Sequence, residues 1–187
     1  MGHAQAQNFH DIIHAYEDLA DKFGLWDAAG IMKEYGCSDD GFIDFRAWLI
    51  AQGREVYFAA LADPDSLADV VPYGDCCFEQ LSYVGDYAHE QLTGKSAYDQ
   101  TDWARYETLL TELEQDIVYK GGIEFPREGP ELKQYLPRLC AAHPGWDGKT
   151  RWNVQQKEMR DLIRAGKAYD QRQAPKKKHR SHGGEAR

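Results

Sequence analysis

The chain has 187 residues, of which 42% are hydrophobic and 28% are charged, and its formal net charge at pH 7 is −9. A chain of this length and composition can bury one ordinary core, so we expect one folded unit with appendages. Residues 1–170 hold 16 Lys and Arg against 30 Asp and Glu, whereas residues 171–187 hold 6 against 1. The acidic body repels phosphate backbones, which argues against nucleic acid as its partner, while the basic tail could attract one.

The cysteines and the hydropathy of the chain indicate its cellular compartment. The sequence contains no paired CxxC pattern, and its four cysteines are Cys37, Cys76, Cys77 and Cys140. We find no signal peptide and no apolar run of membrane-spanning length. We therefore expect a cytoplasmic protein with reduced thiols and no membrane span.

The first predicted helix runs from Asn8 to Phe23, and Gly24 follows as a natural stop. Its apolar residues recur at helical spacing, which predicts an amphipathic helix. A shorter helix is expected over residues 25–32, where small residues favour close packing against a neighbour. The pair Tyr35-Gly36 should end it.

Residues 36–53 specify a helix most strongly. Ser38 can cap its N-terminus, and Asp39 and Asp40 lie where the helix dipole favours negative charge. The next apolar residues recur at three- and four-residue spacing and predict a buried face made of Phe42, Phe45, Trp48 and Leu49. Gly53 supplies the stop.

Four more helical segments follow in the sequence. Residues 54–61 can form a helix until the sequence DPDS at 63–66 imposes a turn, after which a short helical turn reaches Val70. The next helix has its apolar residues at Phe78, Leu81, Val84, Tyr87, Ala88 and Leu92 and ends at Thr93-Gly94. Another begins at Thr101 or Asp102 and presents one long apolar face through Trp103, Tyr106, Leu109, Leu110, Leu113, Ile117 and Val118.

The remaining segments become less apolar toward the C-terminus. Residues 131–142 are expected to form the last core helix, which Pro137 can kink. Residues 153–168 have helical propensity but few residues to bury, and residues 174–184 contain no core residue, which predicts disorder.

No window of the sequence alternates apolar and polar residues with period two, so we predict an all-α fold. The expected organisation is a single compact multi-helix domain over residues 1–144. A weak amphipathic helical extension then covers 145–170, and a basic, disordered C-terminal tail covers 171–187.

Several of these segments resemble a known family. They are CSDDGF (37–42), FRAWLI (45–50), GREVY (53–57), LWDAA (25–29), ALADPD (60–65) and the helix from CFEQL (77–81) to Thr93-Gly94. On these residues the chain is similar to a bacterial family of uncharacterised proteins, the domain of unknown function 4240. The resemblance covers roughly residues 16–94 and, more loosely, the chain to Ala142. It implies a small bacterial cytosolic protein with a regulatory or binding role, and it transfers no activity or catalytic residue to this chain.

Charged residues near this signature form the candidate ligand-binding site. They are Asp39, Asp40, Arg46 and Arg54, with Trp48 beside them. If their side chains converge, the carboxylates could position a metal or a water while an arginine holds an anion. In the structural alternative, the two aspartates satisfy helix-end amides, and Arg46 pairs with an acidic residue on a packed helix.

The sequence HDIIH at residues 10–14 is a weaker candidate. It places two imidazoles one helical turn apart and resembles the zinc-protease HExxH pattern with Asp in place of Glu. Ile12 and Ile13 turn the apolar side of this helix inward, which should leave His10 and His14 at or near the surface. The motif lies outside the segment of family resemblance and has no third ligand, so we predict no metal site.

The cysteines and aromatic residues favour structural roles. Cys37 precedes a helix N-terminus, where a thiolate is favoured, whereas Cys76 and Cys77 lie beside Asp75 and Glu79, which raise a thiol pKa. We expect free, buried cysteines. We also expect core packing for most of the aromatic residues Trp26, Trp48, Trp103, Tyr57, Tyr83 and Tyr87.

Two functions from different classes stay open. The first is a non-enzymatic module that binds another protein through an exposed groove beside the helix of the signature. The second is a small enzyme or ligand-binding protein whose four charged residues converge on a pocket. The chain lacks a P-loop and a GxSxG elbow, which argues against nucleotide hydrolysis and serine acyl transfer. We predict no cofactor, and the sequence leaves the oligomeric state open.

Overall fold

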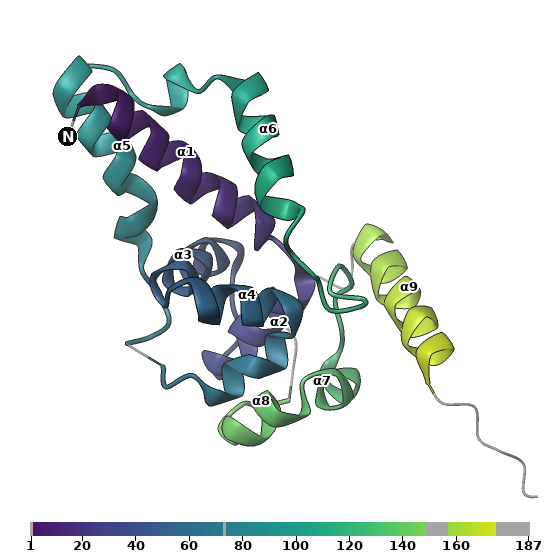
Figure 1. Cartoon of the computed structure of the whole chain (residues 1–187). Coiled ribbons are helices and arrows are strands. Elements are labelled where there is room, and N and C mark those ends of the chain that lie inside the picture. Colours follow the sequence, from purple (N-terminus) through teal and green to yellow (C-terminus); the bar gives the residue numbers. More distant parts are fainter. Residues whose placement is uncertain (1, 73, 149–156, 175–187) are drawn as a thin grey trace, which may run out of the picture.

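The computed structural model describes residues 2–72, 74–148 and 157–174 of the chain. These residues form helices and no strand, which confirms the all-α prediction (Figure 1). The α-helices are α1 His3–Leu19, α2 Phe23–Met32, α3 Asp39–Ala51, α4 Arg54–Ala62, α5 Glu79–Thr93, α6 Trp103–Glu114, α7 Gly129–Tyr135, α8 Pro137–Ala142 and α9 Lys157–Gln173. Two 3₁₀ helices, η1 Pro64–Asp69 and η2 Tyr98–Gln100, complete the set.

None of these helices, within the described ranges, is long and apolar enough to cross a bilayer. The basic tail predicted over 171–187 lies outside the described residues from position 175 onward. Its first residues belong to α9, which ends at Gln173.

The helices form two groups around a shared core. In Figure 1, α1 lies between α5 and α6, and these three helices extend away from the body that contains α2, α3 and α4. The helices α7 and α8 pack against the opposite end of that body, where α8 contacts α2 and η1. The α1–α5 pair is joined to this body through α3, which contacts both helices.

The core lies mainly between α2, α3, α4, η1, α7 and α8. The predicted face of α3 is confirmed, because its apolar side chains are almost completely buried: Phe42, Phe45, Trp48 and Leu49. Burying each side chain of this size stabilises the fold by about 1.5–3 kcal/mol. Leucines from distant segments pack into the same core, namely Leu25, Leu61, Leu67, Leu132, Leu136 and Leu139.

The ends of α3 also follow the sequence signals. Ser38 is the N-cap, and its hydroxyl accepts a hydrogen bond from the backbone N–H of Gly41 at 3.0 Å. Gly53 separates α3 from α4 with φ of 92°, a conformation that favours glycine. The predicted start and stop of this helix are therefore both confirmed.

The first helix ends earlier than predicted. Helix α1 stops at Leu19, and Gly24, expected as the stop signal, lies inside α2. Its backbone N–H donates to the carbonyl of Ile123 at 2.8 Å, and an added Cβ would lie 2.9 Å from the side chain of Ile123. Gly24 is thus a close-packing residue that allows a distant loop to reach α2.

Two other boundaries differ from the expectation. Helix α6 ends at Glu114, so the residues through Val118 do not extend its apolar face. Residues 131–142 do not form one kinked helix, because α7 and α8 are separated at Leu136. Pro137 begins α8, a position where its missing N–H and fixed φ are tolerated.

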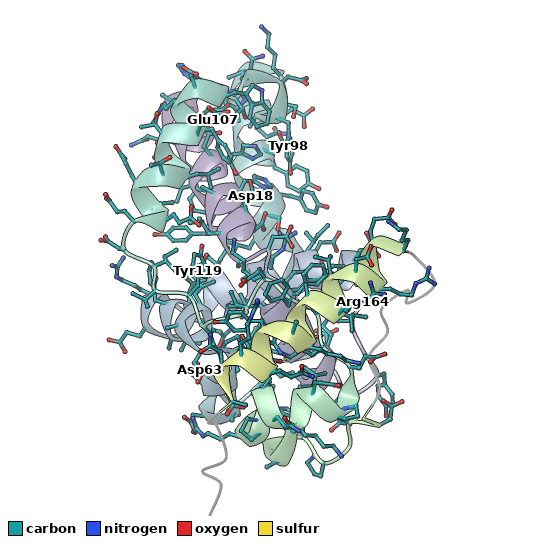
Figure 2. The ribbon with its side chains drawn as sticks, turned by 90° about the vertical axis from the view of Figure 1, so that its right-hand side faces the viewer. Asp18, Asp63, Tyr98, Glu107, Tyr119 and Arg164 are labelled. Carbon is teal, nitrogen blue, oxygen red and sulfur yellow. The ribbon has the colours of Figure 1, made fainter. Side chains whose placement is uncertain are left out.

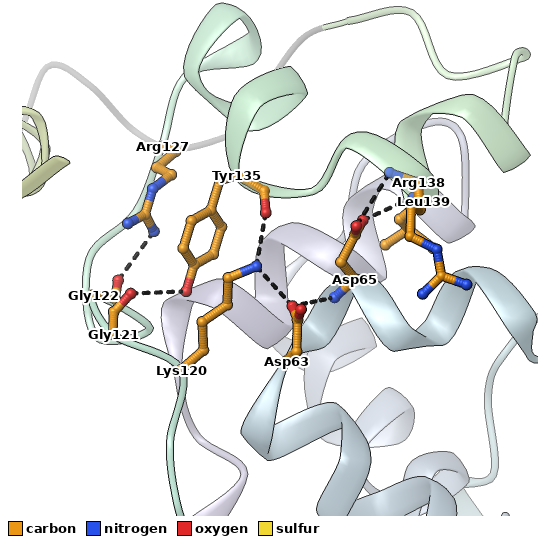
Figure 3. Close-up of polar contacts among 9 residues, drawn as sticks. All are labelled: Asp63, Asp65, Lys120, Gly121, Gly122, Arg127, Tyr135, Arg138 and Leu139. Atoms are coloured by element: carbon orange, nitrogen blue, oxygen red, sulfur yellow. Dashed lines mark hydrogen bonds and ion pairs between the residues drawn. The ribbon is translucent and has the colours of Figure 1, made fainter. Parts of the chain in front are cut away.

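Polar side chains hold the C-terminal helices against the body (Figure 3). The buried carboxylate of Asp65 accepts the backbone N–H groups of Arg138 at 3.2 Å and Leu139 at 2.9 Å. These two donors have no partner within the first turn of α8, so Asp65 caps that helix from a distant segment. Lys120 donates to the Asp63 carboxylate at 2.6 Å and to the Tyr135 carbonyl at 2.8 Å.

Arg127 anchors α9. Its buried guanidinium donates to both carboxylate oxygens of Asp170, at 3.0 and 2.9 Å. It also donates to the carbonyl of Gly122 at 3.0 Å and lies 3.4 Å from the ring centroid of Tyr135. A bidentate pair of this kind fixes orientation as well as contact, so α9 is held by a specific polar interaction.

Candidate functional site

The predicted charged residues are spread along α3 and into α4. Asp39 and Asp40 are exposed in its first turn, whereas Arg54 begins α4, after α3 has ended. The 13 residues of α3 separate them by about 20 Å along the axis, at ~1.5 Å per residue. In the described part of the chain, no hydrogen bond or ion pair joins Asp39 or Asp40 to Arg46 or Arg54, so the structure does not gather the four side chains in one pocket.

Arg46 and Trp48 make contacts typical of residues with a structural role. Arg46 donates to the backbone carbonyl of Glu17 at 3.1 Å and lies 3.6 Å from the carboxylate of Asp21. These contacts fit the structural alternative, in which Arg46 joins α3 to the end of α1. Trp48 lies in the core. Arg54 lines a pocket of about 270 Å³ and covers the Phe58 ring at 4.7 Å.

A different group of residues lies together along α1. His10 is only 3% exposed, so the prediction that this histidine lies at or near the surface is wrong. The ring centroids of His10 and His14 are 4.3 Å apart, and the ring of Tyr98 lies 4.4 Å from the first and 5.1 Å from the second. Gly85 of α5 allows this burial, because it lets the backbone of α5 approach that of α1.

These rings border a cleft of about 200 Å³, which we call the histidine cleft. Its lining residues are His10, Asp11, His14, Asp18, Tyr98, Thr101, Trp103 and Tyr106. In Figure 2, Asp18 and Tyr98 lie along the α1 part of the molecule, away from Arg164 on α9. The cleft thus combines side chains of α1 with those of the segment from η2 to the start of α6.

A buried carboxylate orients one of the two histidines. Nδ1 of His14 lies 2.9 Å from a carboxylate oxygen of Glu17, and the hydroxyl of Ser82 donates to the other oxygen at 2.5 Å. This arrangement places the Nδ1 proton of His14 toward Glu17 and leaves Nε2 as a hydrogen-bond acceptor when the ring is neutral. Ser82 contacts Glu17 rather than a histidine, so the three residues do not form a serine nucleophile with its base.

Two ring nitrogens of the cleft lack partners. Nε2 of His14 and Nδ1 of His10 are buried and have no hydrogen bond within the described ranges. Burial and the neighbouring His14 lower the pKa of His10 below its usual 6.5, so its ring is neutral at pH 7. A buried polar atom without a hydrogen bond destabilises the fold by about 1–3 kcal/mol unless a water or a ligand supplies the partner.

Two carboxylates of the cleft contact neutral groups only. Asp11 is 8% exposed and accepts from the side chains of Gln7 at 2.9 Å and Thr101 at 3.5 Å. Asp18 accepts from the hydroxyl of Tyr106 at 2.8 Å. Neither carboxylate forms an ion pair with a Lys or Arg among residues 2–72, 74–148 and 157–174. The cleft therefore holds negative charge that no basic side chain of these residues compensates.

The HDIIH motif contributes to the cleft rather than to a cluster of metal ligands. The described residues contain no group of three His, Cys, Asp or Glu side chains arranged to hold a metal ion. The sequence already contained a signal for the cleft, because Asp11, His14 and Asp18 follow one another at three- and four-residue spacing on one side of a helix. It contained none for Tyr98, which belongs to η2.

The cysteines are free, as predicted, and their surroundings disfavour thiolates. Burial raises the pKa of Cys37 and of Cys76 to about 11 each, although Lys33 acts in the opposite direction on both. The expected favouring of a thiolate at Cys37 by the helix end is therefore outweighed by desolvation. Cys76 is buried, and the other three cysteines are half-buried.

Helix α5 presents apolar side chains to solvent. Val84 is 47% exposed, Tyr87 60% and Leu92 52%, and we call these three residues the α5 apolar face. The side chains that α5 buries are those of Ser82 and His89, with Gly85 between them. The expectation of core packing is wrong for Tyr87 and also for Trp103, which is 66% exposed.

The described residues define an all-α domain with a polar seam between α1 and α5, a cleft beside that seam and an apolar outer face on α5. Residues 1–91 match the family model described as "Protein of unknown function (DUF4240)", so this part of the chain belongs to that family, as the resemblance indicated. The match begins at residue 1 and includes His10 and His14, so the prediction that HDIIH lies outside the family segment is wrong. The chain matches no curated protein and no solved structure.

Proposed function

We propose that the protein is a non-enzymatic module that binds another protein through the α5 apolar face. The observation that carries this proposal is the orientation of α5, which buries Ser82 and Gly85 while Val84, Tyr87 and Leu92 face solvent. A helix normally turns its apolar side toward the core. Clustered exposed apolar residues on one element typically mark a surface that another molecule covers.

The chemistry of this face suits a protein partner. Tyrosine is enriched among the residues that contribute most to protein–protein binding, because its ring buries a large area and its hydroxyl can still hydrogen-bond. The acidic residues of the same helix are Glu79, Asp86 and Glu90. We expect a partner with an apolar stripe, such as one side of an amphipathic helix, bordered by basic residues.

The resemblance to a bacterial family supports a location in the bacterial cytosol, which we retain as part of the proposal. The alternative, a ligand pocket built from Asp39, Asp40, Arg46 and Arg54, has less support. Asp39 and Asp40 begin α3 and Arg54 lies beyond its end, while Arg46 already contacts the end of α1. That alternative predicts that Asp40→Asn and Arg46→Gln abolish thermal stabilisation by a ligand while the fold persists.

Site-specific photo-cross-linking in the source organism tests the protein-binding proposal. A photoreactive amino acid at Gln91, an exposed position of α5, should give one discrete adduct that mass spectrometry identifies. The same group at Val118, which is also exposed but lies beyond α6, should not give that adduct. Serine at both Val84 and Tyr87 should abolish it while circular dichroism remains unchanged. The proposal fails if the adduct forms equally from Val118 or survives the serine substitutions.

A further inference from the structure

The histidine cleft has the chemistry of a binding site for a small cation. Its innermost carboxylate, Asp11, is more than nine-tenths buried and, within the described chain, contacts only the neutral donors of Gln7 and Thr101. Glu17, which is 4% exposed, adds a carboxylate on the Nδ1 side of His14. A buried negative charge costs several kcal/mol in effective desolvation unless a positive charge approaches it. This pattern excludes an anionic ligand and favours a cation.

The unpartnered ring nitrogens restrict the kind of cation. His10 is almost fully buried and lines the cleft, and its Nδ1 has no hydrogen bond to any described residue. Nε2 of His14 also has no hydrogen bond to a described residue, and the Nδ1 proton of that ring is directed to Glu17. Nε2 of His14 accepts a hydrogen bond when the ring is neutral, and Nδ1 of His10 does so in the tautomer protonated at Nε2, so a ligand with several N–H donors complements both rings. A protonated primary amine has three N–H donors, whereas a quaternary ammonium ion has none.

The walls and the size of the cleft agree with this chemistry. Tyr98, Trp103 and Tyr106 present aromatic rings, which attract a cation at their faces and cover the carbon chain of an amine. The cleft of about 200 Å³ holds roughly six or seven times the ~30 Å³ share of one water molecule. An amine with a short alkyl or aryl group therefore fits, and a polymer does not.

We infer that the histidine cleft binds a small primary ammonium ion, with its N–H groups directed to the Asp11 carboxylate and the free histidine ring nitrogens. This site differs from the α5 apolar face, whose three residues do not line the cleft and include no charged side chain. Ligand binding in the cleft and protein binding on α5 can therefore be tested separately.

The test uses the full chain and three probes that have an ammonium group, namely methylammonium, n-butylammonium and benzylammonium. Isothermal titration calorimetry measures binding, and ¹⁵N NMR of the histidine rings locates it. We expect saturable binding of at least one probe, with shifts of the ring nitrogens of His10 and His14. Tetramethylammonium has the charge but no N–H donor, and 1-butanol has no charge. Both should bind at least tenfold more weakly than the best ammonium probe.

Matched variants decide whether the cleft is responsible. Asp11→Asn removes the charge but retains an acceptor, and it should weaken the best probe at least tenfold. Asp116→Asn removes an exposed carboxylate outside the cleft and should leave the affinity unchanged. If Asp11→Asn does not fold, Asp18→Asn serves as the charge variant. Absence of saturable binding by all three probes, equal binding of tetramethylammonium, or an unchanged affinity in the charge variant would overturn the inference.

Discussion

Replacement of Gly85 by alanine tests the close approach of α1 and α5. An alanine Cβ at this position would lie 2.7 Å from Cα, Cβ and the backbone nitrogen of His10. Two of these three atoms belong to the backbone of α1, so a rotamer change cannot relieve the contact. The two helices would have to separate along their shared seam.

The expected magnitude follows from two opposing effects. Alanine is favoured over glycine inside a helix by about 1 kcal/mol. Overpacking of a tight contact costs about 1–3 kcal/mol, and occasionally more where backbone must move. Because α1 and α5 make the most extensive contact between helices in the described chain, we expect Gly85→Ala to lower the free energy of unfolding by up to about 2 kcal/mol net.

Urea unfolding followed by circular dichroism measures this change, and Gly30→Ala is the matched control. Gly30 lies in α2, where an added Cβ would have its nearest neighbour at 3.7 Å, an ordinary contact distance. The control should therefore be neutral or stabilising. A Gly85→Ala protein as stable as the Gly30→Ala protein would show that the seam is not closely packed, and the reasoning about the histidine cleft would lose its geometric basis.

Three further predictions concern single groups. Asp65→Ala removes the acceptor of two backbone N–H groups of α8 and should cost about 1–3 kcal/mol in urea unfolding, with a smaller change for alanine at the exposed Asp69. The pKa of His10 is lowered in the folded state, so the unfolded state binds more protons and the free energy of unfolding should fall as the pH drops below 6.5. His10→Gln should reduce this fall when unfolding is measured as a function of pH. An equal dependence on pH in the variant would contradict the lowered pKa of His10. The Cys37 pKa of about 11 should make its alkylation by iodoacetamide at pH 8 at least roughly tenfold slower than in the urea-unfolded chain, as followed by mass spectrometry.

The elements that the sequence predicted well are those with local signals. Helix α3 has its cap, its buried face and its stop within one continuous stretch, and each of these depends on interactions between near neighbours. The end of α5 at Gly94, which adopts φ of 72°, is equally local. Periodicity and end signals therefore sufficed for the helices and for the all-α class.

The errors arise where a distant segment determines the outcome. Gly24 resembles a stop signal, but its contact with Ile123 makes it a packing residue inside α2. Asp65 resembles a turn residue, yet it also caps α8, more than seventy positions away. The pairing of Arg127 with Asp170 had no local signal at all. Sequence spacing contains no information about such contacts without knowledge of the topology.

The sequence did not predict the histidine cleft for the same reason. The charged residues around α3 are close in the sequence, but the 13-residue helix places Asp39 and Asp40 far from Arg54 in space. The histidine cleft combines α1 with residues near position 100, which η2 brings against it. The HDIIH motif drew attention to the correct helix, whereas the inference from Ile12 and Ile13 gave the wrong exposure for His10.

Helix α5 shows that close approach, rather than hydropathy, decides which side of a helix is buried here. The backbone of α1 lies so near Gly85 that no larger residue of α5 could take its place, so Val84 cannot rotate into the seam, while Leu92 stays half exposed in the last turn of α5. Their exposed side chains should then contribute little to folding, and glutamine at both positions should change the free energy of unfolding by no more than about 0.5 kcal/mol each. Truncation of a core residue of this size would lower the free energy of unfolding by about 2–5 kcal/mol. A loss in that range, measured in urea, would mean that this face packs inside the fold, and the protein-binding proposal would have no surface to act through.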